Sequence, residues 1–301
     1  MIKYLTGLAK AVAICAAAIF ALSGAVAYAQ GSEGCLAAAD LRDKDIHRHA
    51  GVLDGNPDLC LSEFQFEENG LNWQLTIIAN TRHEAGPTIY LLHDNENAAF
   101  DTAIYSLLKY GGKLIAVEAA DGREFNGQDP NRNFGMTKPD TASCTQMKRK
   151  PAPIFTQMMM DLRNRSQGFI LTMHNNADGH TGNGGSGGIS AARQSAVMKG
   201  MMAPNGGDED DAILLAGTTP FEQDSRAKKA TEFFHKLGIN VIYEHVTPER
   251  NDCSFSNHVV LKGIAPYYNI EAEHGHVAQQ KHMLDAMMKF HRIKVRNAGV
   301  K

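Results

Sequence analysis

The sequence has few cysteines and no marked excess of charge of one sign, and each absence excludes a class of function. Five cysteines occur in 301 residues and none forms a C-x-x-C pair, which argues against a zinc site built from cysteine. The formal net charge is −3 at pH 7, so the chain lacks the basic surface that binds phosphate backbones. We therefore expect no nucleic acid partner.

Long apolar runs are also scarce, and the clearest one lies at the N-terminus. Residues 11–26 are almost all apolar, follow Lys3 and Lys10, and precede a small-x-small pattern at residues 27–29. This order predicts a signal peptide, residues 1–29, that is cleaved after Ala29. Because the run is short for a membrane span, we expect no stable membrane insertion after cleavage and an exported protein, periplasmic or secreted. An uncleaved anchor is the alternative interpretation.

Four cysteines remain after that cleavage, and an even number in an exported chain indicates two disulfides. We favour Cys35 with Cys60 and Cys144 with Cys253, because the first two share the N-terminal segment. The sequence leaves the other pairings open.

Short apolar strands alternate with amphipathic helices through most of the chain. Residues 30–70 resemble an irregular lead-in. We expect strands at 73–78, 88–92, 113–117, 169–173, 240–243 and 267–270, and helices at 97–110, 154–163, 225–237 and 279–293. This alternation predicts an α/β fold, a three-layer α/β/α sandwich with a central mixed, mostly parallel sheet. Without an internal repeat or a linker that would separate two domains, residues 30–301 should form a single domain.

Two stretches interrupt this rhythm. Residues 175–188 are rich in Gly and Asn, and residues 203–219 carry Gly206-Gly207 and then an acidic cluster, Asp208 to Asp211. We expect both to be loops near an active site, since structureless insertions of this length in compact domains are usually functional or mobile. The acidic cluster is interpreted as a solvated face, because the regular spacing of calcium ligands is absent.

Polar side chains come directly after several of the expected strands. His93-Asp94-Asn95-Glu96 follows one strand, His174 follows another, and Glu271 follows a third. Residues just past the carboxyl ends of strands face the ligand crevice of an open α/β sheet. Two histidines with one carboxylate suit zinc and leave a fourth position for water, so the remaining glutamate would be an acid/base.

The order of these motifs resembles the zinc carboxypeptidase family, which includes the succinylglutamate desuccinylase and aspartoacylase deacylases. The chain shows H-x-x-E, then Asp129-Pro130-Asn131-Arg132-Asn133-Phe134, then a histidine after a strand, and finally a late strand with a glutamate. The resemblance spans roughly residues 75–290. It implies a zinc metallocarboxypeptidase-like hydrolase with one Zn²⁺ per chain.

The resemblance also implies a role for each matching residue. His93, Glu96 and His174 would be the metal ligands, and Asp129 would hydrogen-bond the first zinc histidine. Asn131 and Arg132 would bind the free carboxylate of the substrate, since a guanidinium forms two parallel hydrogen bonds with a carboxylate. Glu271 would be the catalytic base. Glu273 competes with Glu271 for that role, because both point to the same face of a continuing strand.

One position of the family pattern has no clear counterpart. A second arginine would stabilise the oxyanion, and Arg123 is the candidate here.

The predicted function is a zinc-dependent exopeptidase that hydrolyses an amide next to a free C-terminal carboxylate. Export would make peptidoglycan stem peptides available as substrates. The alternatives are a deacylase acting on an N-acyl amino acid and a non-catalytic zinc- or peptide-binding protein.

Overall fold

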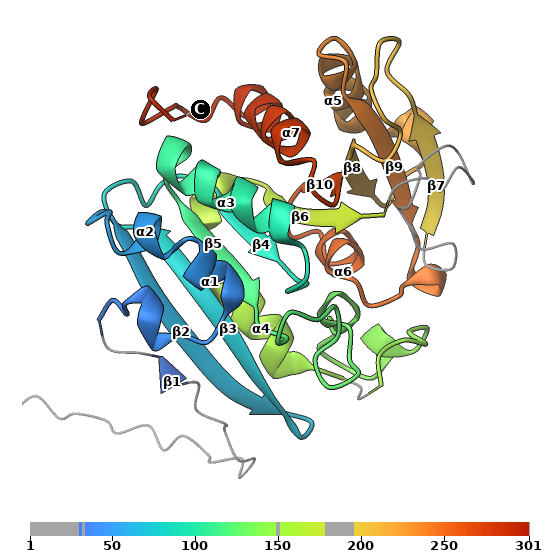
Figure 1. Cartoon of the computed structure of the whole chain (residues 1–301). Helices are drawn as coiled ribbons and strands as arrows, with labels where there is room; N and C mark the ends of the chain where they lie inside the picture. Colours follow the sequence, from blue (N-terminus) through green and yellow to red (C-terminus); the bar gives the residue numbers. More distant parts are fainter. Residues whose placement is uncertain (1–29, 32–33, 149–150, 178–195, 301) are drawn as a thin grey trace, which may run out of the picture.

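The computed structural model describes residues 30–31, 34–148, 151–177 and 196–300 (Figure 1). The signal peptide predicted over residues 1–29 and most of the Gly-rich stretch at 175–188 lie outside these ranges. The described helices are α1 Lys44–Arg48, α2 Ala50–Leu53, α3 Asn97–Tyr110, α4 Pro153–Asp161, α5 Ser225–His235, α6 Phe255–Leu261 and α7 Val277–Phe290. Among them, none is both long and apolar enough to cross a membrane.

The described strands form one sheet in the order β1-β2-β3-β5-β4-β6-β10-β8-β9-β7. Their bounds are β1 Gln30–Gly31, β2 Leu59–Glu68, β3 Leu71–Asn80, β4 Thr88–Leu91, β5 Lys113–Val117, β6 Ile170–Asn176, β7 Ala196–Met201, β8 Ala212–Gly217, β9 Asn240–Val246 and β10 Tyr267–Glu273. The centre, β5-β4-β6-β10, is parallel. Five of the nine pairings are antiparallel, so the predicted mixed sheet is confirmed but a mostly parallel one is not.

The expectation of an irregular lead-in at residues 30–70 is wrong. β2 and β3 form a long antiparallel hairpin in which Glu68 lies opposite Leu71. The two residues between them, Asn69 and Gly70, have φ values of 56° and 74°. Asn-Gly is the pair that two-residue hairpin turns favour, because both positions need a positive φ. The sequence therefore contained a hairpin signal that the prediction did not use.

A second strand was missed inside the stretch 203–219. β8 is an apolar run that pairs with β10 on one side and with β9 on the other. A strand that is covered on both faces is apolar at nearly every position and shows no alternation. The expectation of a loop over the whole stretch 203–219 is therefore wrong.

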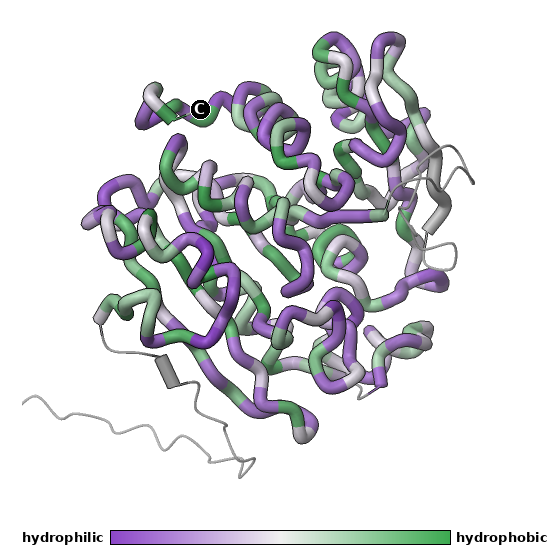
Figure 2. The backbone as a smooth tube through the Cα atoms, viewed as in Figure 1, coloured by the Kyte–Doolittle hydropathy of each residue, from purple (hydrophilic) through white to green (hydrophobic). Residues whose placement is uncertain are grey.

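Two apolar clusters lie on opposite faces of the sheet. Alternate side chains of β4 divide between them: Ile89 and Leu91 pack in one, and Tyr90 packs in the other. Helices α3, α5 and α7 contribute to the first cluster, and α4 and α6 contribute to the second. Figure 2 shows apolar stretches along the strands, with hydrophilic residues concentrated in the connecting loops. A mixed α/β fold is confirmed, while the three-layer sandwich stays a prediction.

Both favoured disulfides are present. Cys35 bonds Cys60 and Cys144 bonds Cys253. The second bridge joins residues 109 positions apart. The backbone N–H of Phe134 also donates to the carbonyl of Cys253 (3.0 Å). The disulfide and this hydrogen bond together hold the segment after Arg132 against the segment that leads into α6.

Candidate metal centre and pocket

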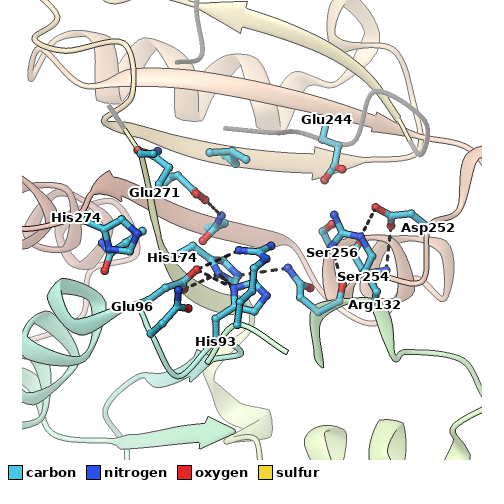
Figure 3. Close-up of a pocket in the computed structure, with 18 of the residues that line it drawn as sticks. His93, Glu96, Arg132, His174, Glu244, Asp252, Ser254, Ser256, Glu271 and His274 are labelled. Atoms are coloured by element: carbon cyan, nitrogen blue, oxygen red, sulfur yellow. Dashed lines mark hydrogen bonds and ion pairs between the residues drawn. The ribbon is translucent and has the colours of Figure 1, made fainter. Parts of the chain in front are cut away.

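His93, Glu96 and His174 come together at the carboxyl ends of two neighbouring parallel strands (Figure 3). His93 lies just past β4, and His174 lies in the last part of β6. Glu96 occupies the N-cap position of α3, yet its side chain makes no capping hydrogen bond. Its carboxylate instead contacts both imidazoles. The sheet and the start of one helix thus aim three side chains at one point.

The ligand atoms of this group have the spacing of a metal site. Nδ1 of His93 lies 3.1 Å from Nδ1 of His174, and the two Glu96 oxygens lie 2.8 Å and 2.9 Å from these nitrogens. Tetrahedral zinc with bonds of about 2.0–2.1 Å would hold its ligand atoms roughly 3.3 Å apart. Two Nδ1 atoms in contact need a proton or a cation between them. The donor set therefore fits a divalent metal such as zinc.

Burial strengthens the electrostatic interactions of His93 and Glu96 with their charged neighbours. Burial alone would lower the pKa of His93, but Glu96 and Asp129 outweigh it and raise that pKa to about 9. Burial raises the pKa of Glu96, and the two histidines outweigh it and lower that pKa to about 2. Nε2 of His93 contacts Asp129 at 2.9 Å, as the resemblance implied, and this contact directs Nδ1 toward Glu96.

Glu271 lies beside the metal group. Its Cα is the register partner of His174 across the parallel pair β6–β10, so both side chains point to the same face. It lines the pocket, and its side chain accepts a hydrogen bond from Asn269 at 2.7 Å. Burial raises the pKa of Glu271, which suits a group that must take up a proton.

Glu273 lies two residues further along the same strand and contacts His276 at 3.2 Å. It is not among the residues that line the pocket, whereas Glu271 is. The location favours Glu271 over Glu273 as the base, although the role itself stays a prediction.

Arg132 lies at the far end of the same pocket, away from the metal group (Figure 3). Asn131 lies between the two ends, because its side-chain nitrogen is 3.5 Å from Nε2 of His174. Nε of Arg132 lies 3.1 Å from Asp252, and Oδ1 of Asn131 accepts a hydrogen bond from the backbone of Phe255 at 3.1 Å. The side chains of both predicted recognition residues thus already have partners within the protein. A substrate carboxylate would have to share Arg132 with Asp252.

Sequence reasoning missed the acidic character of this far end. Glu244 lines the pocket from β9, and burial together with Asp252 raises its pKa to about 7. Ser254 and Ser256 lie beside it. The signal was present in the sequence: a carboxylate within the apolar strand Asn240–Val246 is unusual unless it serves a site.

The remaining candidate, Arg123, lies near the metal group, and three histidines from the end of the chain lie near or beyond the pocket. Arg123 lies 3.7 Å from Glu96 and 3.4 Å from Asp129 at the mouth of the metal group, where its side chain is 47% exposed. His274 lines the pocket, His276 contacts Asp211, and His282 contacts the carbonyl of Leu237. The pocket, which Arg123 and His274 line together with the metal group, measures about 310 Å³.

No protein-family model matches the sequence, and no curated protein matches it. Among solved structures, the chain is similar to a candidate metallopeptidase from Shewanella denitrificans OS217 (12% identity, TM-score 0.44, covering 82% of this chain and 88% of that one). A variant of the cell shape determinant protein Csd4 from Helicobacter pylori has 11% identity and a TM-score of 0.43, covering 71% of this chain and 53% of that one. The LapA aminopeptidase of Legionella pneumophila has 9% identity and a TM-score of 0.41, covering 86% and 64%. TM-scores below 0.5 do not assign the chain to a family.

Proposed function

We propose that this protein is a zinc-dependent exopeptidase that releases a residue with a free carboxylate from the end of a peptide. The observation that carries the proposal is the convergence of His93, Glu96 and His174 next to Glu271 in one pocket. Two imidazoles and one carboxylate are a donor set that catalytic zinc uses with an open fourth position. Because this group lies at one end of the pocket and Arg132 at the other, the scissile amide and the terminal carboxylate could be bound together.

A zinc ion held by these three residues would supply a Lewis acid for the scissile carbonyl and would lower the pKa of water. Glu271 would take the proton from the attacking water and pass it to the leaving amine. Its raised pKa favours this exchange, since a base of very low pKa would hold a proton poorly. Asp129 would hold His93 in one orientation, and Arg123, which lies 3.7 Å from Glu96, would stabilise the negative charge that develops on the scissile carbonyl oxygen.

The far end of the pocket narrows the choice of substrate. Arg132 offers a guanidinium for a carboxylate, while Asp252 and Glu244 offer two carboxylates close to it. This mixture of charges favours a released residue whose side chain carries a cation beside its terminal carboxylate. Stem peptides of peptidoglycan that end in a residue with an amino group fit this description, and the predicted export would bring them within reach.

Mass spectrometry of substrate mixtures tests the proposal. The zinc-loaded protein is incubated with free-acid peptides ending in lysine, glutamate or leucine, with stem peptides, and with N-acyl amino acids. We expect loss of one C-terminal residue, fastest for lysine and for stem peptides with a terminal amine. Cleavage of the N-acyl amino acids alone would favour the deacylase. No product with any substrate, at full zinc content, would favour a binding protein. Glu271→Gln is the matched control for a contaminating peptidase.

A further inference from the structure

A second group of metal-ligand side chains comes from the loop before β8 and from the end of β10, the strand that also carries Glu271. The acidic group consists of Asp208, Asp210 and Glu273, whose carboxylate oxygens lie within 4.8 Å of one another. Asp210 is 1% exposed and Glu273 is 7% exposed. The sequence-based interpretation of Asp208 to Asp211 as a solvated face is therefore wrong for its buried members.

The chain holds these acids in place from several elements. The backbone N–H of Asp210 donates to Asp208 (3.1 Å), and the side chain of Asn240 donates to the carbonyl of Asp208 (2.7 Å). Asp211 accepts a hydrogen bond from the backbone N–H of Glu273 (3.0 Å). The loop 203–211 is thus tied to β9 and to the end of β10. Such preorganisation lowers the cost of gathering ligands around an ion.

Asn176 provides an independent indication of a ligand. Its side chain lies beside Glu273, because the two residues are register partners in the parallel pair β6–β10. The Asn176 amide nitrogen donates to the carbonyl of Asp210 at 2.7 Å, which fixes the orientation of the amide. Asn176 is 6% exposed, and its Oδ1 is buried without a hydrogen-bond donor among the described residues. A buried acceptor without a donor is destabilising, and a coordinated cation would satisfy it.

The donor atoms indicate the class of cation. Carboxylates and an amide oxygen are the ligands that Ca²⁺ and Mg²⁺ prefer, and Ca²⁺ tolerates irregular geometry completed by water. Zinc prefers the imidazoles of the neighbouring group. His276 contacts Glu273 (3.2 Å) and Asp211 (3.1 Å) from outside and orients both carboxylates.

We propose that Asp208, Asp210, Glu273 and Oδ1 of Asn176 bind one divalent oxygen-preferring cation of the calcium type. The ion joins the loop 203–211 to the ends of β6 and β10. His174 and Glu271 lie two residues before Asn176 and Glu273 on these strands, about 7 Å away. The ion therefore stabilises the strand ends that carry the pocket. The proposal does not depend on the peptidase activity.

Calcium binding by the full-length, zinc-loaded protein tests this site. Bound calcium is counted by elemental analysis after dialysis, and the affinity is measured by calorimetry with CaCl₂ and, separately, MgCl₂. We expect one calcium per chain in addition to zinc, and a rise of about 5 °C in Tm at saturating calcium. Asp208→Asn should weaken calcium binding at least tenfold, and it should fold normally because Asp208 is exposed.

Glu209→Gln is the matched control, because it makes the same change of charge in the same loop outside the acidic group. It should bind calcium like the wild type. Three outcomes would overturn the proposal: no calcium bound and no shift in Tm, equal losses in Asp208→Asn and Glu209→Gln, or a second zinc that Asp208→Asn removes. Retention of calcium in Asp208→Asn with loss in Asp43→Asn would place the ion instead at the separate acidic group Asp43, Asp94 and Glu118.

Discussion

The two ends of the pocket are built on different principles. At the metal end, His93, Glu96 and His174 contact one another and are almost fully buried, so their geometry is set by strands and by a helix start. At the far end, Arg132 lies opposite Asp252 on segments that loops and the Cys144–Cys253 bridge hold together. Strands and a helix start thus position the proposed metal ligands, whereas loops position the residues proposed to recognise the substrate.

Both ends carry excess negative charge, but different groups supply it. The metal end combines two imidazoles with the carboxylates of Glu96 and Asp129, and a divalent ion would neutralise their excess negative charge. The far end carries Asp252 and Glu244 against one guanidinium, and burial keeps the pKa of Glu244 at about 7. A bound cation is therefore expected at both ends, supplied by a metal at one and by the substrate at the other.

The largest effect should follow from removal of a metal ligand. His174→Ala leaves two ligands, which hold zinc too weakly for catalysis. Elemental analysis should show zinc falling from about one per chain to almost none, with loss of all measurable activity. His282→Ala, which removes an exposed histidine outside the pocket, should keep both. A folded, unchelated wild-type sample without zinc would end the zinc proposal.

The next largest effect should follow from substitution of the proposed catalytic base, Glu271. Glu271→Gln cannot accept a proton, so kcat should fall about 10²- to 10⁴-fold while the zinc content is unchanged. Glu273→Gln makes the same change two residues away, outside the pocket lining. Because Glu273 is also a proposed ligand of the second cation, this variant is assayed at saturating calcium, where it should retain activity within tenfold. An active Glu271→Gln with an inactive Glu273→Gln would reverse this assignment.

A smaller effect is expected at the far end. A charge-assisted hydrogen bond contributes about 1.5–3 kcal/mol, so amidation of the substrate C-terminus should lower kcat/KM roughly ten- to a hundredfold. In Arg132→Ala this discrimination between free acid and amide should disappear, and Arg132→Lys should restore little of it, because an ammonium lacks the planar fork.

Arg165→Ala is the control for the loss of a positive charge, since Arg165 is an exposed residue that pairs with Asp161. If Arg132→Ala and the wild type distinguish free acid from amide equally well, Arg132 does not bind the carboxylate. The pairing with Asp252 would then be its main role.

The metal end could be predicted from sequence because its signals are local. H-x-x-E follows an apolar strand, and His174 and Glu271 lie on strands that the parallel centre of the sheet places side by side. The pairing of Arg132 with Asp252 could not be predicted in the same way. These residues lie far apart in the chain, and a disulfide-linked segment brings them together.

The other errors have a similar origin. Asp210 looked solvated because the side chain that covers it, Asn176, lies elsewhere in the chain and contacts it only in the fold. β8 was missed because strands covered on both faces lack alternation. The hairpin at Asn69-Gly70 is different, since its signal was local and was overlooked.

The most gradual effect that we predict, about tenfold per pH unit, is the pH dependence of zinc binding. Without metal, Glu96 and Asp129 hold a proton on His93, whose pKa is about 9 against an ordinary value of 6.5. The proton stabilises the metal-free fold fully below pH 6.5, and this contribution is lost as the pH rises through 9. Zinc must displace the same proton at neutral pH. Its apparent affinity should therefore rise about tenfold per pH unit from pH 7 to 9 and then level off.

Competition with a chromophoric chelator at pH 7, 8, 9 and 10 measures this slope, and calorimetry in buffers of different ionisation enthalpy counts the released proton. Asp129→Asn removes one of the two carboxylates that hold the proton, so its plateau should begin at a lower pH. Its affinity on the plateau should also fall about 10- to 100-fold, because His93 loses the partner that orients it. A wild-type affinity that does not change between pH 7 and 9 would show that His93 is neutral before zinc binds. The contacts of Glu96 and Asp129 with His93 would then serve only to orient the ring.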